Sequence, residues 1–252
     1  MQKILGCIRK AVQFYDLIKD GDKVAVAISG GKDSLVMLQG LAEFRRFAGI
    51  DYSLEAITID PCFDGIEGDY SAVERLCEKL GVHYTVEKTD IAKIVFDIRK
   101  EKNPCSLCAK MRRGALHELS KSLGCNKLAL GHNNDDVVET FIMNLFGEGR
   151  IACFAPKSYL SRRDLTVIRP LCLASEAQVR AAVKHTGIEV VKSKCPADKH
   201  TRRQDVKDWL YARERQDKGF IIRLFGAMRR ADLNGWGFLT DKEQSEEEQS
   251  KE

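Results

Sequence analysis

The sequence lacks several features that would place it in a specialised class. It contains no run of about eighteen apolar residues, the length that a transmembrane helix requires. It has no apolar N-terminal segment followed by a small-residue cleavage site, and no internal repeat. We therefore expect a cytoplasmic protein that contacts no membrane. At 252 residues, it is expected to form one α/β domain with a modest appendage.

Nine cysteines stand in a chain with no secretory signal. Disulfides are rare in reducing compartments, and an odd number of cysteines spread along the chain argues against a disulfide framework. We expect most of these thiols to be buried as small hydrophobic side chains.

The net charge of +4 is unevenly distributed. Residues 241–252 carry six acidic residues and two lysines, so residues 1–240 carry a net charge of +8. A basic body suits a polyanionic partner such as nucleic acid, although the same charge also aids solubility. Residues 241–252 contain no apolar side chain, and we expect them to be disordered.

The segment from Val24 to Ser34 joins an apolar, β-branched strand to an amphipathic helix. Two adjacent glycines let main-chain N–H groups approach a ligand, and a helix N-terminus favours an anion. These features predict a phosphate-binding cradle formed by Ser29, Gly30, Gly31, Lys32, Asp33 and Ser34. The alternative is a glycine turn with helix-capping serines. No upstream glycine stands at the spacing that a G-x-x-x-x-G-K-S/T loop requires.

Strand patterns alternate with helical ones along the chain. We expect strands at 24–28, 54–60, 83–87, 127–130 and 166–170, with a short last strand at 189–191. Helices are expected at 2–19, 33–47, up to Gly81, up to Gly124, up to Phe146, at 175–185 and over most of 205–230, with a loop at 147–163. Strands separated by helical spacers predict a parallel, Rossmann-like α/β sheet with helices on both faces.

This pattern also suggests a division of the chain. We expect an N-terminal helix at 1–20, a nucleotide-binding catalytic domain at 21–195, a basic helical extension at 196–240 and the acidic tail at 241–252.

Three candidate sites follow expected strands: the cradle, Asp60, and the segment from Gly131 to Asp136. In open α/β sheets, ligands bind at the carboxyl ends of the strands, so ATP would lie across these three sites. Asp135 or Asp136 would help to hold Mg²⁺, although both could simply cap a helix. Asp60 would lie on the adenosine side, or would only form a turn.

Cys105 and Cys108 form a C-x-x-C motif at an expected helix start, where thiolates are favoured. A redox dithiol, half of a zinc site and a cluster site all fit this motif. Zinc is disfavoured, because no second C-x-x-C or paired histidine supplies four ligands. Cys195 is the best candidate for a third thiolate. Three cysteines could hold a [4Fe-4S] cluster and leave one iron open to a ligand such as hydrosulfide.

The cradle resembles the PP-loop of the N-type ATP pyrophosphatases, which adenylate an oxygen and release pyrophosphate. The downstream segment Gly131–Thr140, GHNNDDVVET, is similar to the G-H-x-x-D-D-x-x-E-T stretch of tRNA-modifying members. Together with the C-x-x-C motif and a late cysteine, these motifs follow one another as in the two-thiocytidine synthetase family of tRNA thiolases. The resemblance covers about two thirds of the chain. Related two-thiouridine enzymes carry flanking zinc modules that this chain lacks, which favours the thiocytidine branch.

The resemblance implies an adenine nucleotide alpha hydrolase-like fold and ATP-dependent sulfur transfer to tRNA. The C2 oxygen of a pyrimidine, expected to be a cytidine in the anticodon loop, would be adenylated and then replaced by sulfur. A cluster on Cys105, Cys108 and Cys195 is implied, with catalytic roles for these cysteines and for Lys32, Asp33 and Arg113. The implied ATP-binding residues are the cradle, Asp60, Gly131, His132 and Asp136, although His132 could instead be structural. The implied partners are tRNA, a sulfur donor (sulfide or a cysteine desulfurase) and a second copy in a homodimer.

Contact with RNA would use clustered basic residues and aromatic rings. Lys and Arg contact phosphates without reading bases, and aromatic rings stack on unpaired bases. The basic candidates are Arg150, Lys157, Arg162, Arg163, Lys192, Lys194, Lys199, His200, Arg202 and Arg203, and the aromatic ones are Trp209, Tyr211 and Trp236. A basic helix that is merely solvated is the simpler alternative.

Three other functions remain open at this point. An adenylating enzyme with an amine nucleophile, like lysidine synthetases, would have no use for the C-x-x-C. A thiolase acting on a small molecule would turn over without RNA. A redox-sensing RNA- or nucleotide-binding module would release no pyrophosphate.

Overall fold

A computed structural model describes residues 1–100, 104–191, 194–195 and 202–237. At its centre is a six-stranded sheet in the order β3-β2-β1-β4-β6-β5. Five strands are parallel, and only β5 runs antiparallel to its neighbour β6. The strands are β1 (Lys23–Ala27), β2 (Ser53–Asp60), β3 (His83–Lys88), β4 (Lys127–Ala129), β5 (Lys157–Leu160) and β6 (Leu165–Ile168).

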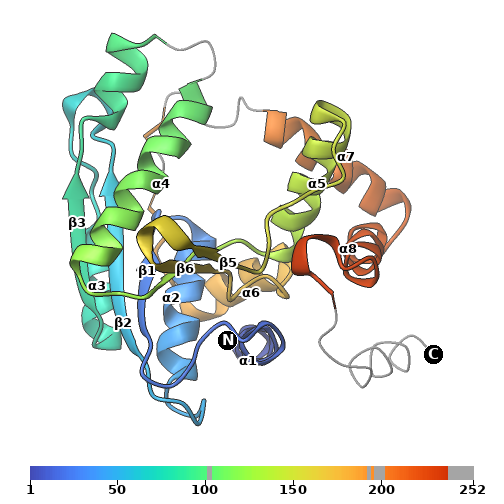
Figure 1. Cartoon of the computed structure of the whole chain (residues 1–252), viewed down its shortest axis with the longest axis horizontal. Coiled ribbons are helices and arrows are strands. Elements are labelled where there is room, and N and C mark those ends of the chain that lie inside the picture. The colour runs from blue at the N-terminus through green and yellow to red at the C-terminus, as the bar shows by residue number, and fades with distance from the viewer. Residues whose placement is uncertain (101–103, 192–193, 196–201, 238–252) are drawn as a thin grey trace.

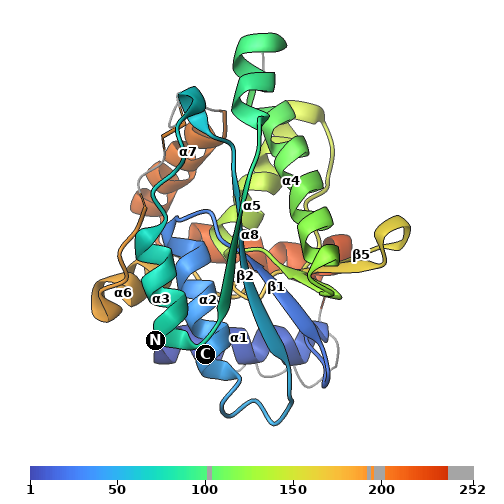
Figure 2. The same cartoon turned by 90° about the vertical axis from the view of Figure 1, so that its left-hand side faces the viewer.

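Helices cover both faces of this sheet, as expected for a Rossmann-like fold (Figure 1). Figure 2 shows α2 and α3 on one side of the strands and α4 on the other. The helices are α1 (Gln2–Tyr15), α2 (Lys32–Phe44), α3 (Ser71–Leu80), α4 (Pro104–Ser122), α5 (Asn134–Glu148), α6 (Glu176–Thr186), α7 (Arg202–Gln216) and α8 (Phe220–Arg230). Four short helical turns are η1 (Phe63–Gly65), η2 (Lys93–Ile98), η3 (Ser161–Arg163) and η4 (Leu233–Gly235).

The central strand β1 is buried on both faces. Successive side chains of a strand point to opposite sides, so its apolar residues enter two different cores. Val24 and Val26 pack into the core shared with α1, α2 and α6, whereas Ala25 packs into the core beneath α4. This burial on both sides explains why the strand reads as a continuous apolar run.

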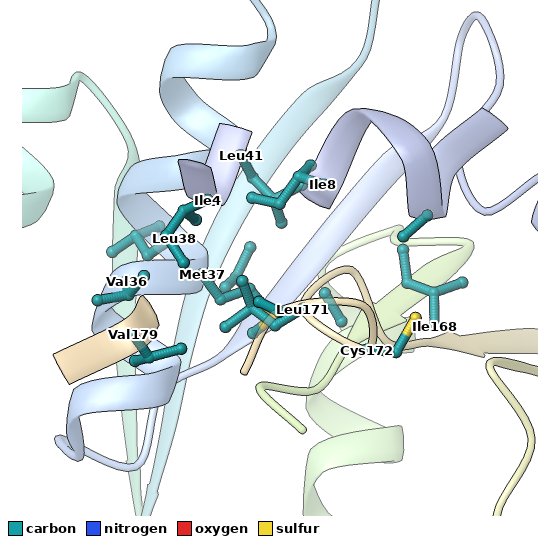
Figure 3. Packing of buried hydrophobic residues seen from close by; sticks show 14 of the residues in the cluster. Ile4, Ile8, Val36, Met37, Leu38, Leu41, Ile168, Leu171, Cys172 and Val179 are labelled. Atoms are coloured by element: carbon teal, nitrogen blue, oxygen red, sulfur yellow. The ribbon is translucent and has the colours of Figure 1, made fainter. Parts of the chain in front are cut away.

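The first helix joins the main core instead of standing apart from it (Figure 3). Ile4 and Ile8 of α1 are buried against α2, near Leu38 and Leu41. A Cβ on Gly40 would lie only 2.5 Å from the Cδ1 atom of Ile8, so a glycine permits this close approach. Burying this apolar face stabilises both helices.

Two predictions about the later half of the chain are wrong. Part of the expected loop at 147–163 forms β5, which pairs with β6 through the short turn η3. The expected strand at 189–191 is absent from the described residues, because the N–H of Val191 donates to the carbonyl of Gly30 in the cradle, not to a strand.

The segment at 205–230 is mostly helical, as expected, and forms two helices: α7 ends at Gln216, and Gly219, with a φ of 82°, is the N-cap of α8. Beyond α8, Trp236 is completely buried, with its ring 5.7 Å from Tyr15 and 5.5 Å from Phe225. The prediction that Trp236 stacks on a base is therefore wrong. The tail at 241–252 lies outside the described residues, and no described helix is long and apolar enough to cross a membrane.

Candidate active site

The predicted cradle lies at the carboxyl end of β1, where Gly31 caps the N-terminus of α2. Gly30 has a φ of 79°, and a Cβ there would lie 2.7 Å from the Cβ atom of Val191. Glycine is therefore required both by the backbone and by its neighbour. The hydroxyl of Ser34 donates to the carbonyl of Gly31 at 2.9 Å, and the N–H of Ser29 donates to the Ser34 hydroxyl at 3.2 Å. These bonds hold the turn in shape at the positive end of α2.

The second motif lies against the same turn. A Cβ on Gly131 would lie 3.0 Å from the backbone nitrogen of Ser34, so any side chain there would crowd this approach. Asn133 also donates from Nδ2 to Oδ1 of Asp33 at 2.9 Å. The two signature segments, far apart in sequence, thus form one continuous backbone surface.

Two adjoining cavities open at this end of the sheet. The first, which we call the outer cavity, has a volume of about 620 Å³ and reaches from the cradle to the ends of β2 and α3. The second, the inner cavity, has a volume of about 290 Å³ and lies between the cradle and the second motif. Both are lined by Ser29 and Arg112. An elongated ligand could therefore lie in both cavities at once.

Arg112 is a site residue that sequence reasoning missed. The expected residue was Arg113, which is exposed and does not line either cavity. The helical phase of α4 decides between these neighbours: Arg112 follows Cys108 by four residues and shares its face. The signal was present in the i, i+4 spacing from the C-x-x-C motif.

Asp60 lies at the end of β2 and lines the outer cavity. Its two carboxylate oxygens accept the N–H groups of Cys62 at 3.0 Å and Gly68 at 2.7 Å. The side chain therefore fixes the loop that forms one wall of the outer cavity. Asp60 thus has the turn-forming role, at a place where a ligand can also reach it.

Asp33 and Asp136 both line the inner cavity. Burial raises the pKa of Asp136, and the negative charge of Asp33 adds to the increase. Asp136 also accepts the N–H of Asn133, completing a capping box at the start of α5. In the described ranges, no group of three or more His, Cys, Asp or Glu side chains could hold a metal ion. Any Mg²⁺ between these two carboxylates would need phosphate oxygens as further ligands.

Asp135 faces away from both cavities. Its carboxylate accepts the N–H of Glu176 at 2.8 Å and the hydroxyl of Tyr211 at 3.3 Å. Of the two adjacent aspartates, Asp136 is therefore the one that lines the inner cavity.

His132 lines the inner cavity, with its ring 4.8 Å from that of Phe154. Burial lowers the pKa of His132 to about 3, and the positive charges of Arg169, Arg203 and Arg113 contribute. Its Nδ1 is buried without a hydrogen-bond partner in the structure. The imidazole is therefore neutral near pH 7.

Lys32 does not extend freely from the cradle. Its Nζ lies 2.7 Å from Asp33 and 3.2 Å from Glu176, the first residue of α6. Glu176 was expected only as part of the helix at 175–185. Its contact with Lys32 could not be predicted, because the two residues lie far apart in the sequence and no local pattern links them.

The three cysteines named by the sequence, all within the described residues, lie close enough for the charges of Cys105 and Cys195 to act on Cys108, but the structure does not bring the three together as a group that could hold a metal ion. Burial raises the pKa of Cys108, and the charges of Cys195 and Cys105 add to the increase while Arg112 opposes it. Lys194, the neighbour of Cys195, lines the outer cavity. Cys195 thus follows a residue that lines the outer cavity, but none of the three thiols lines it. By contrast, Cys77, Cys125 and Cys172 are buried in the core, as expected of small hydrophobic residues.

Several basic candidates for RNA contact already have acidic partners. Arg150 pairs with Glu148, Lys157 with Asp16, Arg163 with Glu118, and Arg203 with Glu139. Lys192, Lys199 and His200 lie outside the described residues. Trp209 keeps 38% of its surface exposed beside Phe146 and Phe220, while the Tyr211 hydroxyl is held by Glu176.

Comparison with known proteins agrees with this geometry. Residues 5–214 match the model of the PP-loop domain family. A tRNA-cytidine(32) 2-sulfurtransferase of Syntrophotalea carbinolica is 39% identical over 198 residues, covering 78% of this chain and 76% of the relative. A tRNA-cytidine(32) 2-sulfurtransferase of Geobacter metallireducens is 36% identical over 234 residues, covering 90% of this chain and 89% of the relative.

A solved structure is similar as well. The U34-tRNA thiolase NcsA of Methanococcus maripaludis, determined with its [4Fe-4S] cluster, superposes with a TM-score of 0.74 at 28% identity. The match covers 91% of this chain and 78% of NcsA. Family, sequence relatives and fold agree, and the chain therefore belongs to the tRNA-cytidine(32) 2-sulfurtransferase family of PP-loop proteins.

Proposed function

We propose that this chain is an ATP-dependent sulfurtransferase that replaces the C2 oxygen of cytidine 32 in tRNA with sulfur, as the names of its relatives indicate for them. The observation that carries the proposal is the pair of cavities joined at Ser29 and Arg112. One cavity extends from a phosphate cradle, and the other contains two carboxylates and a neutral histidine.

The outer cavity suits the adenosine of ATP. Phe63, Ile66 and Tyr70 line it with apolar surface, and Ser29 and Gly31 of the cradle stand at its edge. The triphosphate would then lie on the N-terminus of α2, with Lys32 beside it. Asp33 and Asp136 would hold Mg²⁺, which neutralises phosphate charge when bound.

The inner cavity suits the reacting base. The C2 oxygen of the cytidine would attack the α-phosphate, giving an adenylated base and pyrophosphate. Arg112 lines both cavities, so its guanidinium is placed to stabilise the negative charge that develops between them. Neutral His132 would orient the base through its buried ring nitrogen.

Cys105, Cys108 and Cys195 would hold the cluster. Their all-sulfur donor set suits iron and not Mg²⁺, and Cys108 interacts electrostatically with both other thiols, although the three must come closer together than in this structure to hold a metal. When bound, the cluster supplies an iron site for sulfur delivery. The activated C2 carbon would gain sulfur and lose its oxygen with AMP.

RNA would also contact an aromatic surface that we define as Phe146, Trp209 and Phe220. Their rings meet edge to face at 6.0 and 6.2 Å, and Phe146 is 71% exposed. The guanidinium of Arg213 lies 5.8 Å from the Trp209 ring and adds positive charge. Because α5 rises about 15 Å from Asp136 to Phe146, this surface would hold a nucleotide other than the target.

The activity is tested with protein reconstituted anaerobically with iron and sulfide, then incubated with ATP, sulfide and unmodified tRNA. We expect AMP, pyrophosphate and 2-thiocytidine in equal amounts, and no thiolation after Cys108→Ser. Formation of ADP, or full activity of Cys108→Ser, would contradict the proposal. Turnover without RNA would point to a small-molecule thiolase instead.

The remaining partners rest on the family resemblance. We propose a cytoplasmic protein that receives sulfur from sulfide or a cysteine desulfurase and assembles as a homodimer. Sedimentation at several protein concentrations tests the dimer, and thiolation with desulfurase and cysteine in place of sulfide tests the donor.

A further inference from the structure

Behind the cradle lies a buried carboxylate that the reaction outlined above does not use. Glu176 is only 2% exposed, and its Oε1 lies 3.2 Å from Nζ of Lys32 and 2.7 Å from the guanidinium of Arg180. Its Oε2 accepts from Nζ of Lys207 at 2.7 Å and from the hydroxyl of Tyr211 at 2.5 Å. Side chains from three helices thus meet at a single carboxylate.

Burying a charge is costly unless it is paired and hydrogen-bonded. Burial alone would raise the pKa of Glu176, but hydrogen bonds from Lys207, Tyr211 and Arg180 hold it well below its usual range. Glu176 is therefore ionised whenever the protein is folded near neutral pH. The two cations besides Lys32, together with the tyrosine, already satisfy it, so Lys32 is not needed to balance a bare charge.

The contact matters more for Lys32 than for Glu176. A lysine side chain has four methylene groups joined by rotatable bonds, and ordering it costs rotamer entropy. Lys32 is ordered by two carboxylates, one from Asp33 next to it and one from Glu176 across the core. Asp33 is next to Lys32 in the chain and moves with it, so this ion pair alone does not fix the ammonium group in space. Glu176 belongs to another helix and therefore holds the ammonium group in place relative to the rest of the fold.

We propose that Glu176 is a positioning residue that holds Lys32 ready for its contact with the ATP phosphates. The inference rests on the proposed function, because it assumes that ATP occupies the cradle. Glu176 touches no reacting atom. It acts through Lys32, while its Oε2 is held by Lys207 and Tyr211 of the basic helix α7.

The inference is tested by a double-mutant cycle read out as affinity for a non-hydrolysable ATP analogue with Mg²⁺. The four proteins are wild type, Glu176→Gln, Lys32→Met and the double variant. Loss of one charge-assisted contact should weaken binding about tenfold in Glu176→Gln. In the Lys32→Met background, the same substitution should change the affinity less than about twofold. Glu118→Gln, which removes an exposed ion pair with Arg163, serves as the matched control and should bind like wild type.

Equal weakening by Glu176→Gln in both backgrounds would overturn the positioning role, because it would show a general structural effect. So would unchanged affinity of Glu176→Gln. If this variant does not fold, Glu176→Asp keeps the charge and withdraws it by one methylene, and the same cycle applies with a smaller expected weakening. A wild-type protein that fails to bind the analogue would instead refute the proposed function, and this inference with it.

Discussion

At the cradle, the identity of a few residues is restricted by steric contacts and not by the chemistry of a side chain. Gly131 is one of them, because a Cβ there would lie 3.0 Å from the Ser34 nitrogen and 3.2 Å from the Asp33 carbonyl carbon. These neighbours are backbone atoms, which cannot move aside as a flexible side chain could. Replacing Gly131 must therefore displace the N-terminus of α2 itself.

We expect Gly131→Ala to weaken binding of Mg-ATP at least about tenfold, since the phosphate donors belong to the displaced turn. Gly6→Ala in α1 is the matched control. Nothing lies within 4 Å of its added Cβ, so it should leave ATP affinity unchanged and stabilise the helix by about 0.5–1 kcal/mol. Titration calorimetry measures the first effect and urea unfolding the second. Unchanged affinity in Gly131→Ala would show that the two motifs do not support each other.

His132, in the inner cavity, makes the stability of the folded protein depend on pH. Its pKa is lowered to about 3 by burial and by nearby arginines, so the folded protein binds fewer protons at this ring than the unfolded chain does between about pH 3 and 6.5. Its contribution to stability is therefore present above about pH 6.5 and is lost as the pH falls.

We expect His132→Asn to make the free energy of unfolding less sensitive to acid, by about 2 kcal/mol between pH 7 and pH 4.5. His185→Asn, at an exposed position of α6, is the control and should follow the wild-type curve. Urea unfolding at a series of pH values gives the comparison. Parallel curves for His132→Asn and wild type would contradict the argument.

Among the elements, those with strong local signals were predicted correctly. The run of β-branched residues before Ser29 and the helix after it are β1 and α2, and the cysteine motif opens α4. Short elements with weak periodicity were not. The four residues of β5 are too few to show a clear alternation of apolar and polar side chains. Residues 189–191 resemble a strand in sequence, but the N–H of Val191 donates to the carbonyl of Gly30 in the cradle.

The helices α5, α7 and α8 carry the aromatic surface proposed to contact RNA. Trp209→Ala should weaken tRNA binding about tenfold, because stacking of one base is worth about 1–3 kcal/mol. Its affinity for ATP should not change, since Trp209 lines neither cavity. Tyr159→Ala, an exposed aromatic residue on β5, is the control. Filter binding measures the affinity of both variants for tRNA. An equal loss of tRNA affinity in Trp209→Ala and Tyr159→Ala would count against a specific stacking surface.

For the whole molecule, the ionic and aromatic contacts between distant segments decide how the site is assembled. None of these contacts could be predicted from sequence, because each joins residues far apart in the chain. The link from Glu176 to Lys32 is one example, and the packing of Trp236 on Tyr15 is another. The latter fastens the segment after α8 to the first helix.

Trp236→Ala should therefore destabilise the whole fold by about 3–5 kcal/mol, as expected for a fully buried aromatic residue. The indole N–H also donates to the carbonyl of Phe154 at 2.7 Å, which is lost as well. The half-exposed Trp209 offers the comparison, since Trp209→Ala should cost far less stability. Urea denaturation of both variants measures the difference, and similar midpoints would show that the C-terminal segment is not part of the core.

Val191 connects two parts of this machinery. Its N–H bonds to Gly30, and its side chain packs directly over that glycine, while Cys195 follows only four residues later. A stretch of that length spans at most about 14 Å. Cys195, the third proposed cluster ligand, therefore lies within that distance of the residue that packs on Gly30. A change in the length of this connection is therefore expected to disturb the proposed nucleotide site and the proposed cluster site together.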